Sequence, residues 1–452
     1  MKADKTGMHG VWASRWTFIL AATGSAVGLG NIWKFPYITG ENGGGAFVLV
    51  YLICILTAGI PVMMAEVLLG RKGRMSPINT MKELAGQEKA PQFFQGIGWM
   101  GAISGFFILS FYSVIAGWTL YYVVKMISGD FSNVTADGAG EIFGGLLSDP
   151  LLLTLLHTIF MVMTGVVIAR GVHKGLEDGV RTMMPLLFLM LILLLGYSLT
   201  TSGFSQAAAF LFSFDFEHLT GASVVEALGH SFFTLSLGMG AIMAYGAYMP
   251  KQASLGKTIL AVGFLDTLVA LVAGLIVFSI VFTNGLEPGA GPGLMFQTLP
   301  LAFSALPGGQ WIGSAFFILV AIAAWSSALS IAEPAVAWAV EKGWSRGMAT
   351  FAVCGFAWVL GLGTVLSFNE WSDVTLWGKT FFDSLDFLTA NIMLPLGGML
   401  IAIFVGWFMT AESTNAEARI KNPTVFAIWR FMLKFVSPLA VLAIFLHGLK
   451  VF

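Results

Sequence analysis

Charged residues are scarce in this sequence. Asp, Glu, Lys and Arg make up 10% of its 452 residues, whereas about 25% is typical of a soluble domain, and 57% of the residues are hydrophobic. A chain with so little charge and so much apolar surface is not expected to stay in water, so the composition excludes a soluble globular protein. The net charge of −1 gives no reason to expect a nucleic acid or another strongly charged partner.

Cysteine is also rare, and motifs for cofactor chemistry are missing. The two cysteines, Cys54 and Cys354, both lie in long apolar segments, so we interpret them as small buried hydrophobes rather than a disulfide or metal pair. The sequence contains no phosphate-binding loop, zinc spacing or nucleophile elbow. These absences argue against ATP hydrolysis and against a membrane-embedded enzyme, and no organic cofactor is expected.

Long apolar runs, in contrast, recur along the whole chain. About 30 Å of hydrocarbon must be crossed by each membrane helix, and the sequence has eleven runs of sufficient length. The chain is therefore predicted to be an all-α integral membrane protein of a single transmembrane domain, 1–452, in the lipid bilayer. The runs lie near 13–38, 44–70, 92–125, 150–170, 178–200, 225–249, 256–284, 311–341, 347–367, 381–411 and 424–449.

Basic residues predict the orientation of these segments. With eleven spans, nineteen of the 23 Lys and Arg fall on the side of the N-terminus; the exceptions are Lys34, Lys125, Lys379 and Lys450. Loops rich in Lys and Arg stay on the cytoplasmic side. We therefore expect a multi-pass protein of the cell (plasma) membrane with a cytoplasmic N-terminus and an extracellular C-terminus. The first apolar segment lacks a small-residue cleavage site, so no cleaved signal peptide is expected.

Two of the eleven segments contain residues that are unsuited to a continuous helix. The first carries "TGSAVGLGNIWKFPY", residues 23–37, and the sixth carries "SFFTLSLGMGAIMAYGAY", residues 231–248. Gly24 and Gly28 alone could form a small-residue contact with a neighbouring helix. That alternative does not explain Asn31 and Pro36, nor the second glycine cluster. Interrupted segments at matching positions of two halves indicate a transporter built from inverted repeats.

Such a break predicts a binding site. Backbone groups freed at membrane depth need partners in protein, water or ions. The N-terminal end of a half-helix favours an anion, and the C-terminal end and the unwound carbonyls favour a cation. We therefore expect the breaks in the first and sixth segments to bind the transported solutes.

A few polar side chains within the apolar segments are further candidates for function. We favour a structural role for Glu66, as an acceptor for unwound backbone, over a functional one. Asp266 is either protonated or next to a cation, because a lone buried carboxylate is costly. His230 is expected to pack and form a hydrogen bond. Ser326 and Ser327 either bond to their own helix or offer the oxygen ligands that hard cations prefer.

Five motifs now permit a comparison with a known family. They are "SAVGLGNIWKFP", "ENGGGAF", "FYSVIAGW", "FFTLSLGMG" and "WSSALSIAEP", in this order. Together they resemble the neurotransmitter:sodium symporter family, and the similarity runs over nearly the whole chain. The resemblance implies the LeuT fold, with two repeats of five helices (about 13–200 and 225–411), helices 1 and 6 broken mid-membrane, and one extra helix (about 424–449). Eleven spans are typical of the bacterial branch.

The resemblance also implies a substrate site, two sodium sites and two gates. The substrate would lie against Ser25, Ala26, Leu29, Gly30, Ile108, Tyr112, Phe233, Thr234, Ser236, Met239, Ser327 and Ile331. The first sodium would be bound by Ala26, Asn31, Thr234 and Asp266. The second sodium would be bound by Gly24, Val27, Ala323, Ser326 and Ser327. Tyr112 and Phe233 would form the outer lid, backed by the ion pair Lys34–Asp386, and the inner gate would include Trp12, Tyr248 and Glu341.

The sequence departs from the family pattern at three places. Lys34 replaces the arginine of many relatives and loses its two-pronged contact with Asp386. His9 stands where a basic gate residue is expected, opposite Glu341, with Lys5 as the alternative. Gly175 and Pro185 have a spacing associated in the family with cytoplasmic unwinding of the fifth span, although an ordinary proline kink explains them nearly as well.

The resulting prediction is a sodium-coupled symporter rather than an enzyme. Its substrate is expected to be a hydrophobic L-amino acid, aliphatic or aromatic including tryptophan, moved by alternating access with two sodium ions. Chloride is expected to be unnecessary because Asp266 supplies a negative charge at the first sodium. No obligatory protein partner is expected. The competing hypothesis is a channel or receptor that binds amino acids without moving them.

Overall fold

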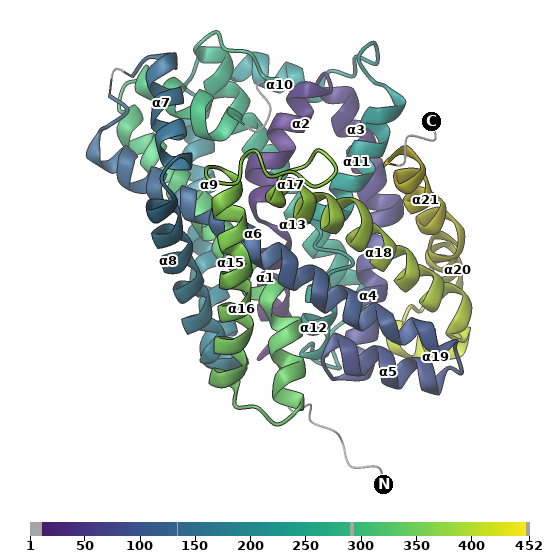
Figure 1. Ribbon diagram of the computed structural model, residues 1–452. Helices are drawn as coiled ribbons and strands as arrows, with labels where there is room; N and C mark the ends of the chain where they lie inside the picture. Colours follow the sequence, from purple (N-terminus) through teal and green to yellow (C-terminus); the bar gives the residue numbers. More distant parts are fainter. Residues whose placement is uncertain (1–10, 133, 290–292, 449–452) are drawn as a thin grey trace.

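The computed structural model describes residues 11–132, 134–289 and 293–448, and within them all regular secondary structure is helical (Figure 1). Nine of the described helices are long and apolar enough to cross a membrane. They correspond to nine of the eleven predicted segments. The two that are missing from this set are the first and the sixth, the segments in which a break was predicted.

The nine long helices consist of the following elements. They are α3 Gly45–Cys54 with η2 Ile55–Gly59 and α4 Ile60–Gly73; η3 Gln92–Gln95 with α6 Gly96–Ser128; α8 Pro150–Ala169; η4 Val172–Glu177 with α9 Asp178–Ser198; α13 Leu255–Thr283; α15 Gly309–Glu341; α16 Arg346–Ser367; α17 Phe381–Asp386 with η6 Phe387–Met393, α18 Leu394–Ile403 and η7 Phe404–Phe408; and α20 Pro423–Phe431 with η8 Met432–Val436 and α21 Ser437–Gly448. The shorter elements outside the spans are α5 Pro77–Gln87, α7 Ala136–Leu147, α10 Phe204–Phe212, η5 Leu294–Thr298, α14 Leu299–Ser304 and α19 Ala411–Ala418.

The first span is interrupted at Val27. Helix α1, Arg15–Ala26, begins after Ser14, whose hydroxyl accepts a hydrogen bond from Thr17 N at 3.1 Å. Val27 is extended, with φ −70° and ψ 109°, and ends the helix. The chain resumes as a π-helical turn, η1 Gly30–Lys34, followed by α2 Phe35–Glu41.

The sixth span is interrupted more widely. Helix α11, Gly221–Thr234, and helix α12, Ala241–Ala247, are separated by six residues. Gly238 and Gly240 have φ values of +81° and +74°, a region that side chains rarely adopt, so the glycine cluster is what allows the chain to turn here. Both predicted breaks are therefore present.

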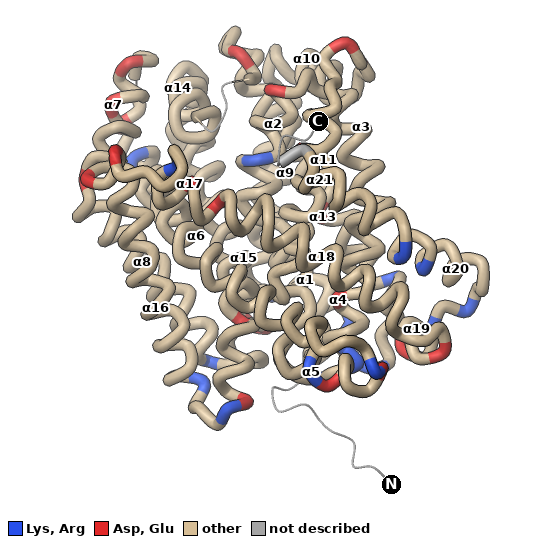
Figure 2. The backbone as a smooth tube through the Cα atoms, turned by 45° about the vertical axis from the view of Figure 1, so that its right-hand side comes forward, with Lys and Arg blue, Asp and Glu red and all other residues tan. Residues whose placement is uncertain are grey.

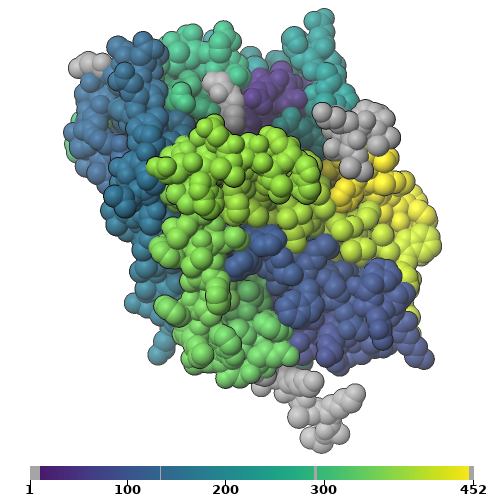
Figure 3. Space-filling model, viewed as in Figure 1, coloured from purple at the N-terminus to yellow at the C-terminus, as the bar shows by residue number. Residues whose placement is uncertain are grey.

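The broken helices lie in the interior of the bundle. Helix α12 packs against α4 and α15, and α1 packs against α13 and α15. At Gly70 of α4 a side chain would collide with the Met243 carbonyl, so the glycine permits the close approach of α12. Figure 3 shows residues of α17 and α18, in lime green, covering the centre of the front face, and α1 lies behind them in Figure 1.

Basic residues gather at one end of the molecule, which we call the basic end. Figure 2 shows Lys and Arg concentrated near α5, α19 and the lower end of α16. The described basic residues there include Arg71, Arg74, Arg346 and Arg419. Lys34 and Lys125 lie in the opposite half.

Candidate functional site

A small cavity lies where the breaks of the first and sixth spans meet. It is bounded by α1, α6, α11, α15 and the two unwound stretches. Its lining is Ser25, Ala26, Gly28, Leu29, Gly30, Ile108, Tyr112, Phe233, Thr234, Ser236, Met239, Ser327 and Ile331. All twelve residues that the sequence assigned to the substrate line this one cavity. Gly28 is the residue that was missed, although it stands within the same motif.

The cavity combines an apolar wall with a few polar atoms. Ser236, at φ +54°, donates from its hydroxyl to Ser25 O over 2.8 Å and so joins the two breaks. The buried hydroxyl of Tyr112 has no hydrogen-bond partner among the described residues. A Cβ at Gly28 would lie 3.0 Å from this hydroxyl. The cavity therefore holds an unsatisfied donor close to the backbone of the first break.

Asp266 joins the two breaks to helix α13. Its side chain is fully buried. The Asn31 amide donates to Asp266 Oδ1 over 2.8 Å, and the Thr234 hydroxyl lies 3.2 Å from Oδ1 and 3.3 Å from Oδ2. Three of the four residues predicted for the first sodium thus form one hydrogen-bonded group, and the fourth, Ala26, lines the adjoining cavity.

Ser327 reaches across from α15 to the end of α1. Its hydroxyl lies 3.3 Å from Gly24 O and 3.1 Å from Val27 O, which are two carbonyls predicted for the second sodium. Ser326 behaves differently, because its hydroxyl donates to Ala323 O of its own helix over 3.0 Å. The Ser327 hydroxyl and two predicted carbonyls of the second site therefore meet at the end of α1, whereas Ser326 and Ala323 bond to each other within α15.

Met184 of α9 contacts this group from a third helix, a contact that no motif predicted. A Cβ built at Gly24 would lie 2.8 Å from the Met184 sulfur, so the thioether packs directly on the helix end. Met184 is fully buried and precedes Pro185. In this conformation α9 is continuous through Pro185, and the turn that contains Gly175 is the π-helical η4. The proline lies inside an intact helix rather than beside an unwound stretch.

Trp12 packs on the end of α12. Its backbone N–H donates to Tyr248 O over 2.9 Å and its indole N–H donates to Tyr245 O over 3.2 Å. Its ring contacts the rings of both tyrosines edge-on. Trp12 is buried, so two of the predicted inner-gate residues, Trp12 and Tyr248, are in direct contact.

An ion pair that the sequence analysis did not identify adjoins these contacts. Tyr248 donates from its hydroxyl to Glu333 Oε1 over 2.6 Å, and Glu333 is fully buried. The Arg346 guanidinium donates to Glu333 Oε1 over 3.0 Å and to Oε2 over 2.5 Å. Arg346 Nε also donates to Ile168 O of α8 over 2.8 Å. The two-pronged contact ties α12, α15, α16 and α8 together.

Glu341, the other predicted inner-gate residue, lies at the end of α15. It accepts hydrogen bonds from Ser76 N over 2.6 Å and from the Asn79 amide over 2.5 Å, and it also bonds the Ser76 hydroxyl. Glu341 thus attaches α15 to the start of α5. The expected partners His9 and Lys5 lie outside the described residues.

The expected outer-gate pair is not formed in this conformation. Within the described residues no ion pair joins Lys34 to Asp386; the Lys34 ammonium instead lies 4.8 Å from the centroid of the Phe233 ring. Both charged side chains are partly exposed, and an exposed lysine gains little from a single carboxylate. Contact with an aromatic face therefore replaces the predicted pair.

Two other polar residues in the spans have structural contacts. Glu66 accepts a hydrogen bond from Gly238 N over 2.5 Å and so caps the unwound stretch, as the favoured interpretation required. His230 packs between Phe35 and Tyr51, with ring centroids 6.0 Å and 5.4 Å away. Neither ring nitrogen has a hydrogen-bond partner among the described residues, so the packing was predicted correctly and the hydrogen bond was not.

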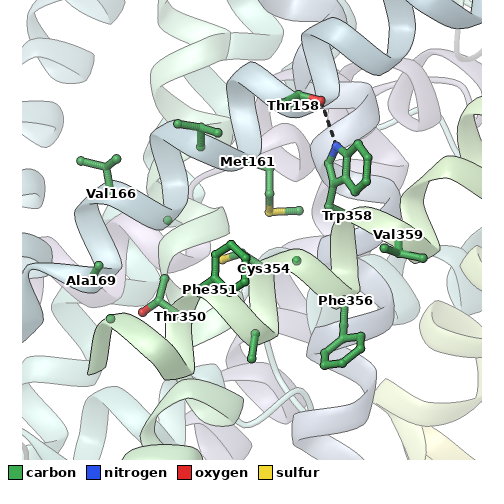
Figure 4. Close-up of a pocket in the computed structure, with 15 residues that line it drawn as sticks. Thr158, Met161, Val166, Ala169, Thr350, Phe351, Cys354, Phe356, Trp358 and Val359 are labelled. Carbon is green, nitrogen blue, oxygen red and sulfur yellow. Dashed lines mark hydrogen bonds between the residues drawn. The ribbon is translucent and has the colours of Figure 1, made fainter. Parts of the chain in front are cut away.

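A larger apolar groove lies elsewhere, between α8 and α16 (Figure 4). Its volume is about 670 Å³. The hydrogen bond drawn in Figure 4 joins the Trp358 indole to the Thr158 hydroxyl over 2.9 Å. None of the residues predicted for substrate, sodium or gates lines this groove. The larger cavity and the predicted site are therefore in different places.

Comparisons with known proteins cover almost the entire chain. The model of the sodium:neurotransmitter symporter family matches residues 9–137 and 141–452. An uncharacterised sodium-dependent transporter of Bacillus subtilis, YhdH, is 38% identical over 96% of this chain and 97% of its own length. A sodium-dependent transporter of Haemophilus influenzae is 34% identical over 97% of this chain and 98% of its own length. The crystal structure of MhsT in complex with L-phenylalanine is 43% identical, covers 97% of this chain and 99% of that one, and has a TM-score of 0.90.

Proposed function

The chain belongs to the sodium:neurotransmitter symporter family and is a sodium-coupled membrane transporter with the LeuT fold; from this premise we propose that it imports hydrophobic L-amino acids. One observation carries the proposal: the cavity between the two breaks has an apolar wall and lies beside a buried carboxylate. Leu29, Ile108, Phe233, Met239 and Ile331 form that wall. No charged side chain lines it to receive a polar substrate tail. The L-phenylalanine bound to MhsT belongs to the same class of substrate.

The substrate is proposed to be a zwitterion rather than a bare amine. Neither break contains an acidic residue, so an ammonium group alone would meet only carbonyl dipoles. An α-carboxylate, in contrast, can accept a hydrogen bond from the free Tyr112 hydroxyl and lie at the start of the second half-helix of span one. Amine-transporting relatives have an aspartate at the position of Gly28. Tyramine and tryptamine should therefore fail to compete with tyrosine and tryptophan.

Two sodium ions are proposed to accompany the substrate. The first would be bound by the Ala26 carbonyl, Asn31, Thr234 and Asp266, with the substrate carboxylate as a further ligand. The second would be bound by carbonyls of Gly24, Val27 and Ala323 with the hydroxyls of Ser326 and Ser327. Oxygen atoms of this kind are the ligands that hard cations prefer. Bound sodium would replace hydrogen bonds such as those from the Thr234 hydroxyl to Asp266 and from the Ser327 hydroxyl to Val27 O.

Transport is proposed to be independent of chloride because Asp266 carries the compensating charge. Animal relatives bind a chloride near the first sodium, and other bacterial members have a carboxylate one turn further along, where this chain has Ala270. A unit charge about 4 Å from sodium contributes on the order of 4 kcal/mol of gross attraction at an effective dielectric constant of about 20. That attraction is large enough to decide whether sodium occupies the first proposed site.

The basic end is proposed to face the cytoplasm of the cell in the plasma membrane. This orientation agrees with the excess of Lys and Arg at that end (Figure 2). The N-terminus would then be cytoplasmic and the C-terminus extracellular. We also propose the division into repeats at about 13–200 and 225–411 with an extra helix at about 424–449. Movement of the broken helices against the other spans would expose the cavity to each side in turn.

Uptake into proteoliposomes tests the proposed function. The purified protein should take up labelled leucine and tryptophan when an inward sodium gradient is imposed, and should not do so under an equal potassium gradient. Unlabelled phenylalanine, tyrosine and isoleucine should compete, and glutamate and lysine should not. Sodium-dependent binding of leucine without uptake would favour a receptor. Equal uptake with sodium and potassium would contradict the coupled mechanism.

A further inference from the structure

Helix α16 has an apolar groove on each of its two sides. The groove toward α8 is the one in Figure 4, and the other, of about 630 Å³, lies between α16, α15 and α6. Ala352, Phe356 and Val359 line both grooves and form the ridge between them. Phe351 is 81% and Phe356 is 69% exposed. Aromatic rings so exposed on a membrane-spanning helix face lipid, so both grooves open to the bilayer.

The second groove ends in a cluster of aromatic and basic side chains. Lys342, Trp338 and Trp344 line it at the basic end, where α15 turns into α16. The Lys342 ammonium lies 5.7 Å from the centroid of the Trp338 ring, and Trp99 packs edge-on against Trp338 with centroids 4.9 Å apart. Among the described residues, Lys342 has no carboxylate partner. Tryptophan is the residue typical of the level of lipid headgroups.

The chemistry of the two grooves fits one occupant. We propose that they bind one anionic diacyl phospholipid of the leaflet at the basic end, with its phosphate on Lys342 and one acyl chain in each groove. The deeper part of the second groove is lined by Phe106, Phe107, Val353 and Leu360, which suit a hydrocarbon chain. Water is a poor occupant because it would need several polar partners there. The positive charge of Lys342 favours an anionic headgroup over a zwitterionic one.

Other basic groups at this end are less suited to the headgroup. Arg346 begins α16, but its guanidinium is bound by Glu333 and Ile168 O. Arg170, at the end of α8, is exposed but does not line either groove. Lys342 is therefore the cation that faces the lipid-binding surface. None of the proposed substrate, sodium or gate residues takes part in this site.

Photolabelling with lipid analogues tests the proposal. The full-length protein is reconstituted in phosphatidylcholine with a trace of phosphatidylglycerol that carries a diazirine in its acyl chain, and labelled peptides are mapped. Label should appear on the α6 peptide with Phe106 and Phe107 and on the α8 peptide with Met161 and Val162. A phosphatidylcholine analogue with the same diazirine should label these peptides about fivefold less, because one lysine contributes roughly this much to headgroup binding.

Two variants separate the headgroup from the chain. Lys342→Gln should lower labelling by phosphatidylglycerol about fivefold and leave labelling by phosphatidylcholine unchanged. Gly355→Leu fills the groove toward α8, where nothing lies within 4 Å of a new Cβ, and should remove the α8 label alone. The matched controls are Lys434→Gln, a lysine 4.8 Å from the Trp407 ring outside both grooves, and Gly196→Leu, an exposed glycine on α9.

Three outcomes would overturn the proposal. The first is equal labelling of the groove peptides by the two lipids in the unmodified protein. The second is a Lys342→Gln variant that labels like the Lys434→Gln control. The third is cross-linking of a photoreactive residue at Phe351 to a second copy of the chain, because a partner protein would then occupy the grooves. Melting temperatures of all variants confirm that each one is folded.

Discussion

The Asn31 side-chain amide donates to the Asp266 carboxylate over 2.8 Å, and thereby fastens the break in the first span to helix α13. The same nitrogen lies 3.1 Å from Asp266 O, and the Asn31 side-chain oxygen accepts from Gly28 N over 3.0 Å. Among the described residues, Asp266 Oδ2 has one hydrogen-bond partner, the Thr234 hydroxyl at 3.3 Å. We expect this weakly bonded oxygen to be the one that meets sodium.

The first prediction follows from that oxygen. Asp266→Asn keeps the shape of the side chain and removes its charge, so the sodium concentration for half-maximal leucine uptake should rise at least about tenfold. Replacing chloride by gluconate should leave uptake by the unmodified protein unchanged. Asp215→Asn, in an exposed loop, is the control. Chloride-dependent uptake, or a variant with ordinary sodium dependence, would contradict the role of Asp266.

The second prediction concerns the width of the cavity. Met239 is flexible and polarizable, so it can yield to substrates of different shape. Met239→Phe replaces it with a rigid ring and should reduce tryptophan uptake more than leucine uptake. Competition assays with both amino acids measure the ratio. Met348→Phe, at an exposed position of α16, should leave the ratio unchanged. Equal losses for leucine and tryptophan would argue against Met239 as part of the wall.

The third prediction is that Ser327 of α15, but not Ser314 of the same helix, binds sodium. Bound sodium at one hundred times its dissociation constant should stabilise the protein by about 2.7 kcal/mol per site. Sodium, but not potassium, should therefore raise the melting temperature, and Ser327→Ala should remove a large part of that rise. Ser314→Ala is the control, because the Ser314 hydroxyl donates to Gln310 O of its own helix over 2.7 Å. If Ser327→Ala retains the full rise, Ser327 is not a sodium ligand.

The fourth prediction concerns the ion pair at the basic end. Arg346→Lys keeps the charge but loses the two-pronged contact with Glu333, and should cost about 1.5–3 kcal/mol for a lost hydrogen bond to a charged group. Thermal unfolding in detergent measures this as a lower melting temperature than that of the unmodified protein. Arg170→Lys, an exposed substitution of the same kind, should have no effect. If the Arg346→Lys variant had an unchanged melting temperature, the two-pronged contact with Glu333 would not be needed for stability.

The broken helices and the cavity could be predicted because their cause is local. Gly238 and Gly240 adopt backbone angles that few other residues tolerate, and Asn31 and Pro36 are uncommon in the middle of a membrane helix, so the sequence itself marks the breaks. The wall residues then followed from motifs of a known family. All twelve line one cavity because they are carried on a few helices whose spacing the motifs determine.

The contacts that were missed depend on how separate helices meet. Met184 packs on Gly24 from a span about 160 residues further along the chain, and no local pattern predicts that contact. Glu333 and Arg346 lie on different helices, and their pairing requires the turn between α15 and α16. The pair of Lys34 with Asp386 is not formed in this conformation, in which the ammonium lies over the Phe233 ring instead, and a partly exposed lysine gains little from a single carboxylate.

The contacts of Glu333 determine where the basic end can come apart. On one side, Arg346 binds both carboxylate oxygens and holds Ile168 O, which makes α15, α16 and α8 a single body. On the other side, Trp12 binds Tyr245 and Tyr248 through backbone and indole, which joins α1 to α12. Tyr248 donates from its hydroxyl to Glu333 and so links the two groups of helices at this point. If the helices separated between Tyr248 and Glu333, the carboxylate would stay paired with Arg346, and water would meet no unpaired charge there.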